Sequence, residues 1–103
     1  MNIQDLLDQL TATSDALAEL APKDPQRFDV KLLALQLEKE VIAGSFDVDK
    51  DISAITVVDL SKLKDLTSQL SQVTDQEQKR TQLVTQILNI SKLALRSTGI
   101  PVP

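Results

Sequence analysis

Apolar residues recur every three or four positions along most of the chain, which is the pattern of helices that bury one side. In the first segment these positions are Ile3, Leu6, Leu10, Leu17 and Leu20, and Thr13 occupies the step where an apolar residue is missing. Pro22 follows the last of them and is expected to stop the helix. The pattern therefore predicts a helix over residues 2–21.

A second helix is predicted over residues 25–43. Asp24 is suited to cap its N-terminus, Pro25 to occupy its first position, and Gly44 to adopt the left-handed conformation that ends many helices. Its larger apolar residues cover more than half of the helix circumference: Phe28, Val30, Leu32, Leu33, Leu35, Leu37, Val41 and Ile42. Such a broad apolar surface predicts contact with two neighbouring helices.

Residues 44–58 are the least regular part of the chain. The β-branched cluster from Ile52 to Val58 weakens helix propensity, so we expect a loop with a short helical turn. A two-stranded excursion is the alternative, but two strands alone would lack partners for stability.

Residues 59–97 contain no glycine or proline, and Gly99 and Pro101 follow them. Their apolar pattern runs from Leu60 to Val73 and resumes at Leu83 after a wholly polar stretch, residues 74–81. One interpretation is a single helix of about 39 residues, roughly 58 Å long. The other is a turn, because Thr74 and Glu77 have the spacing of a capping box that starts a new helix. We favour a continuous or bent helix, since the polar stretch consists mainly of good helix formers.

These elements predict an all-α fold. The expected architecture is a small antiparallel helical bundle in one domain, residues 1–103, with two shorter helices packed on one long C-terminal helix that is continuous or broken. A chain of 103 residues has room for one core.

Composition and charge exclude several classes of function. The net charge of −4 repels phosphate backbones, so we expect no nucleic acid partner. The chain has no histidine, cysteine, tyrosine or tryptophan, which removes the commonest general base and metal ligands. We therefore predict no enzyme and no cofactor.

No apolar run is long enough for a membrane span, and the first residues include acids where a signal peptide needs bases. Both features predict a cytoplasmic protein with no membrane contact.

Asp47, Asp49 and Asp51 resemble the first three ligands of a calcium-binding loop. The remainder of the motif is missing, because Ile52 stands where the sharp turn needs glycine and Val58 stands where a glutamate should close the coordination shell. We interpret these residues as a solvated acidic loop and predict no metal site.

The apolar surface exceeds what one long helix and two short ones would hide from water, which predicts a protein partner. The predicted partner-binding residues lie on the C-terminal helix: Leu83, Val84, Ile87, Leu88 and Leu95. The function expected from this pattern is a non-enzymatic adaptor or chaperone that holds an amphipathic helix of a client. The first alternative is a self-associating structural or regulatory protein, such as a homodimer, with no separate client. The second is a closed monomeric bundle in which the polar stretch is a turn.

The segment from Leu70 to Arg96, in which a polar stretch leads into Leu83, Val84, Ile87, Leu88, Leu93 and Leu95, resembles the C-terminal helix of flagellar and type III export chaperones of the FlgN and FliT kind. The first half is similar to their N-terminal region, with Leu6, Leu7, Leu10 and Leu17, a short break at residues 23–25, and a leucine-rich helix carrying Lys39. The resemblance implies a small bacterial helical chaperone that binds a client before its export.

Overall fold

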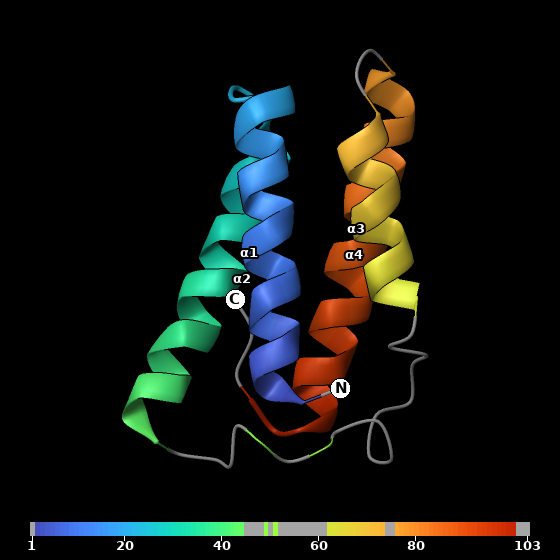
Figure 1. Ribbon diagram of the computed structural model, residues 1–103. Coiled ribbons are helices and arrows are strands. Elements are labelled where there is room, and N and C mark those ends of the chain that lie inside the picture. The colour runs from blue at the N-terminus through green and yellow to red at the C-terminus, as the bar shows by residue number, and fades with distance from the viewer. Residues whose placement is uncertain (1, 45–48, 50, 52–61, 74–75, 101–103) are drawn as a thin grey trace.

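The computed structural model describes residues 2–44, 49, 51, 62–73 and 76–100 (Figure 1). This part of the chain forms four helices: α1 (Ile3–Leu20), α2 (Pro25–Ala43), α3 (Lys62–Gln72) and α4 (Glu77–Ser97). Since the described residues contain no strand, the predicted all-α class is confirmed.

Local sequence fixes the start of α1 and both ends of α2. The Asn2 side chain accepts a hydrogen bond from the Asp5 backbone N–H at 2.8 Å, and the Asp5 carboxylate accepts one from the Asn2 N–H at 3.0 Å. This reciprocal pair satisfies two amide groups that a helix start otherwise leaves without partners. Asp24 caps α2 by accepting from the Gln26 N–H at 2.9 Å, and Gly44 ends it at a φ of 68°. The predicted caps of α2 are therefore confirmed.

The expected continuous C-terminal helix is wrong. The chain instead folds back between α3 and α4, which pack against each other in opposite directions (Figure 1). Gln76 precedes α4 and forms no side-chain cap, while Thr74, the predicted cap, lies outside the described residues. Reversal lets α3 bury Leu63, Leu66 and Leu70, whereas a straight helix of roughly 58 Å would leave much of this stripe in water. Burial of apolar surface outweighs local helix propensity here.

Two helical hairpins make up the bundle. α1 packs most extensively on α2, and α3 on α4; the hairpins meet mainly through α1 against α3, with a smaller contact between α2 and α4. Figure 1 shows α1 and α3 running in one direction and α2 and α4 in the other. α2 thus lies at one side of the bundle, with α1 as its principal neighbour.

All four helices contribute to one core, which consists almost entirely of aliphatic side chains. Thr13 is buried at the gap in the apolar pattern of α1, and its hydroxyl donates to the Gln9 carbonyl at 2.8 Å. This hydrogen bond satisfies the hydroxyl within its own helix, so a threonine can take the place of an aliphatic residue.

Little of the predicted irregular segment can be compared with the structure. Asp51 forms an isolated antiparallel bridge with Asn2 at the start of α1, and Gly44 and Asp49 are exposed. The other residues of the predicted loop at 44–58, and the predicted helix start at 59–61, lie outside the described residues.

Candidate functional site

The five residues predicted to bind a partner lie in the core. Leu83, Val84, Ile87, Leu88 and Leu95 are all buried within the folded chain. The contacts of α4 with α3 and α2 cover this stripe, because the chain reversal supplies the neighbours that a straight helix would have lacked. Their role in partner binding stays a prediction, and it would require the bundle to open.

Among the described residues, four of the five exposed large apolar side chains lie on α2, and the fifth is Leu93 on α4. Phe28, Leu32, Leu35 and Ile42 are 62%, 56%, 50% and 79% exposed, respectively. Scattered exposed apolar residues are common on proteins, whereas these four large side chains lie on one side of one helix. We name Phe28, Leu32, Leu35, Lys39 and Ile42 the α2 outer face.

The α2 outer face is continuous along the helix. Its members follow one another at alternating steps of four and three residues, the heptad spacing of a coiled-coil helix. At 3.6 residues per turn they share one narrow stripe, which runs about 21 Å from Phe28 to Ile42. Lys39 is the only member that is not apolar.

The inner side of α2 carries Val30, Leu33, Ala34 and Leu37, all of which are buried. The prediction that α2 contacts two neighbours is confirmed, since α1 and α4 both touch it. These contacts cover only the inner side of α2, so the other part of its broad apolar surface is exposed. The sequence contains the spacing of both stripes, but nothing in it says which one faces inward.

Charged residues border the α2 outer face. Lys31 and Glu38 are exposed on one edge, and Asp29, with the partly exposed Gln36, lies on the other. In heptad terms Lys31 and Glu38 occupy equivalent positions one heptad apart, and so do Asp29 and Gln36. Such flanking positions select the partner and orientation of a paired helix.

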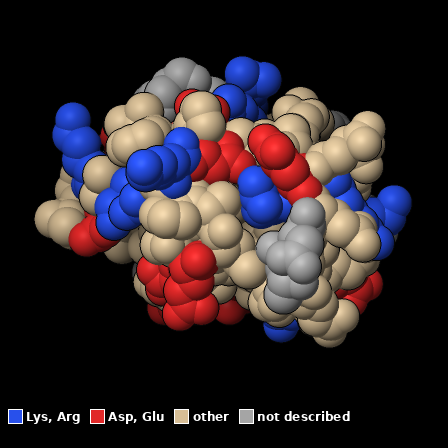
Figure 2. All heavy atoms as spheres, turned by 90° about the horizontal axis from the view of Figure 1, so that it is seen from above, with Lys and Arg blue, Asp and Glu red and all other residues tan. Residues whose placement is uncertain are grey.

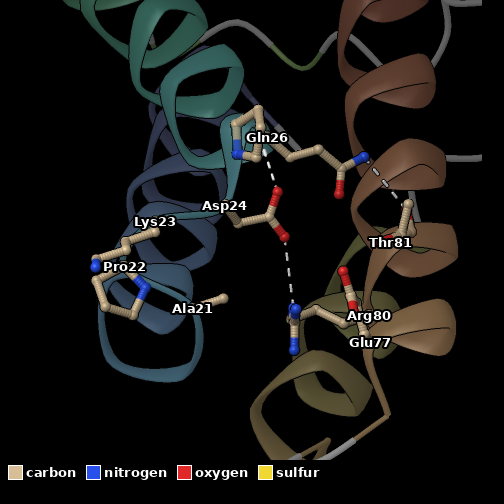
Figure 3. A pocket seen from close by; sticks show the side chains of 9 residues that line it. Ala21, Pro22, Lys23, Asp24, Gln26, Glu77, Arg80 and Thr81 are labelled. Carbon is tan, nitrogen blue, oxygen red and sulfur yellow. Dashed lines mark hydrogen bonds and ion pairs between the residues drawn. The ribbon is translucent and has the colours of Figure 1, made fainter.

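A hollow lies at the end of the bundle where α1 joins α2 and where α4 begins. Its lining includes Pro22, Asp24, Gln26, Glu77 and Arg80 (Figure 3). Asp24 Oδ2 lies 3.5 Å from Arg80 Nε. The Gln26 amide donates to the Thr85 hydroxyl at 3.0 Å and to the Thr81 carbonyl at 3.4 Å. These contacts join the starts of α2 and α4, which is a structural role.

Charge at this end of the molecule is mixed. Figure 2 shows basic and acidic side chains interspersed over the face seen from above. A phosphate backbone is held by a patch of one sign, so this face does not have the charge pattern of a nucleic acid site.

The described residues hold no group of three or more acidic side chains that could bind a metal ion. Of the three aspartates compared above with a calcium loop, Asp49 and Asp51 are exposed and Asp47 lies outside the described part. None of the described helices is both long and apolar enough to cross a bilayer.

Comparison with protein-family models finds no match, and comparisons with curated proteins and with solved structures find none either. The resemblance to flagellar and type III export chaperones therefore stays a prediction.

Proposed function

We propose that this protein is a non-enzymatic protein-binding module that holds an amphipathic helix on the α2 outer face. The observation that carries the proposal is the alignment of Phe28, Leu32, Leu35 and Ile42, each at least half exposed, on one stripe. Leaving these side chains in water is unfavourable, and covering them would contribute on the order of 25 cal/mol for each Å² of apolar surface removed from water.

A helix is the partner that fits this stripe best. Heptad spacing on one helix matches heptad spacing on another, because each side chain then inserts between those of the facing helix. A stripe of about 21 Å corresponds to about 14 residues of a partner helix, or four turns. The partner is expected to carry apolar residues at the same alternating steps.

This binding mode agrees with an adaptor or an export chaperone. Such a protein needs an accessible apolar surface and no catalytic group, and this sequence lacks histidine and cysteine altogether. The resemblance to export chaperones favours a bacterial cytoplasmic protein that shields a client helix before export. In that role the α2 outer face, and not the buried stripe of α4, would be the contact surface.

The test is affinity capture with the tagged full-length chain from its own host, followed by reconstitution with the purified partner. The double variant L32D/L35D should lose binding, because two carboxylates would be buried at the centre of the interface. L93D is the matched control, since Leu93 is 41% exposed and lies on a different helix, α4.

The expected result is one stoichiometric partner that binds the wild type and L93D through a defined amphipathic segment, and binds L32D/L35D at least tenfold more weakly. Equal binding by both variants, with the fold intact by circular dichroism, would exclude the α2 outer face as the client site.

A further inference from the structure

We infer that the α2 outer face pairs with the same face of a second copy of this chain, in an antiparallel arrangement with two-fold symmetry. The inference rests on the proposed function in that both use this face: a second copy covers the face when no client helix is bound, and the two compete for it. Three features of the α2 sequence and its exposure support a second copy as the occupant.

When two copies of α2 are placed antiparallel, the apolar positions of one copy face apolar positions of the other. With the two-fold axis between Leu32 and Leu35, Leu32 of one copy faces Leu35 of the partner subunit, and the reverse contact is generated by symmetry. Ile42 then faces Pro25 of the partner subunit, and Pro25 is also exposed in the isolated chain. Both contacts occur twice, as an interface between identical surfaces requires.

Lys39 distinguishes the two orientations. In a parallel, in-register pair it would lie directly against Lys39 of the partner subunit, which places two like charges in an apolar interface. In the antiparallel pair it faces Phe28 of the partner subunit. An ammonium group over an aromatic ring is attractive, and the methylene stem of lysine packs on apolar surface.

The charged edges of the α2 outer face are complementary to the same edges of a second copy only when the two helices are antiparallel. Two-fold symmetry places the edge that carries Lys31 and Glu38 beside the same edge of the partner. Measured along the helix axis, Lys31 is then offset by only about 3 Å from Glu38 of the partner subunit. Two ion pairs result. On the other edge Asp29 lies beside Gln36 of the partner subunit, which adds no like-charge contact.

Within the described part of the chain no ion pair engages Lys31 or Glu38, and both are exposed. Both groups are therefore available for these contacts. The pairing is short, so the dimer is expected to be reversible and to depend on protein concentration.

Sedimentation equilibrium from low micromolar to low millimolar protein tests the inference. The wild type and L93D should dimerise, and L32D/L35D should remain monomeric with its helical content unchanged. A wild type that stays monomeric over the whole range would overturn the inference.

Charge exchange tests the antiparallel register. K31E and E38K each turn both ion pairs into like-charge contacts, so each should dimerise about tenfold more weakly than the wild type. An equimolar mixture of the two variants restores both ion pairs between unlike chains and should form heterodimers. Failure of the mixture to associate better than either variant alone would exclude this register.

The two proposals fail separately. A client that binds a monomeric wild type through Leu32 and Leu35 would leave the proposed function standing and overturn the dimer. Charge-dependent dimers that bind no client helix would support the dimer and overturn the client role.

Discussion

Asp24 Oδ2 lies 3.5 Å from Arg80 Nε, and this contact joins the start of α2 to the first turn of α4 (Figure 3). The two side chains are only 12% and 11% exposed. Asp24 also caps α2, so a single carboxylate holds a helix end and the junction between two hairpins.

Substitutions at Asp24 should separate these two roles. D24A removes both the cap and the ionic contact, and we expect it to lower the free energy of unfolding by about 1–2 kcal/mol. D24N keeps an oxygen for the cap and should lower it by about 0.5 kcal/mol. Urea denaturation measures both values. In an R80Q background the effect of D24N should disappear, and an unchanged effect there would show that the ionic contact contributes nothing.

Ser91 offers a stabilising substitution. Its hydroxyl is fully buried and has no hydrogen-bond partner among the described residues. S91A removes this unsatisfied group and raises helix propensity, so the free energy of unfolding should rise by about 0.5–1.5 kcal/mol. S68A, at an exposed position inside α3, is the control for propensity alone. If S91A stabilises no more than S68A, the hydroxyl has a partner such as a buried water.

The neighbouring residues Leu32 and Leu33 should differ strongly in their contribution to stability. Leu32 is 56% exposed and Leu33 is 1% exposed. L33Q places an amide in the core and should destabilise the protein by about 3–5 kcal/mol, whereas L32Q should change stability by less than about 0.5 kcal/mol. The free energies of unfolding of the two variants are compared by urea denaturation, at a protein concentration low enough to keep the chain monomeric. Equal effects would mean that the outer side of α2 is also packed.

The double variant I87D/L88D should unfold the protein. Both side chains are buried between helices, and each aspartate would bury a carboxylate at a cost of several kcal/mol, against a total stability of about 5–15 kcal/mol. Circular dichroism should show loss of most helical signal and of the cooperative thermal transition. A folded variant that has lost only client binding would return the partner-binding role to α4.

Local sequence determined the elements of the first half of this protein. The ends of α1 and α2 were predicted to within one residue from the spacing of Ile3, Leu6 and Leu10, the cap at Asp24 and the glycine at position 44. These signals act between neighbours along the chain, so they do not depend on the rest of the fold. The all-α class follows from the same periodicity.

Tertiary structure decided where the second half turns and which apolar stripe faces water. The polar stretch before Glu77 is compatible with a helix or with a turn, and the choice depends on how much of α3 can be buried against α4. α2 carries one apolar stripe through Leu33 and Leu37 and another through Leu32 and Leu35. Periodicity gives their spacing, but only the positions of α1 and α4 determine which stripe is buried, because burial is a property of the assembled bundle. In the assembled bundle the apolar stripe of α4 is buried, and the stripe of α2 through Leu32 and Leu35 is exposed.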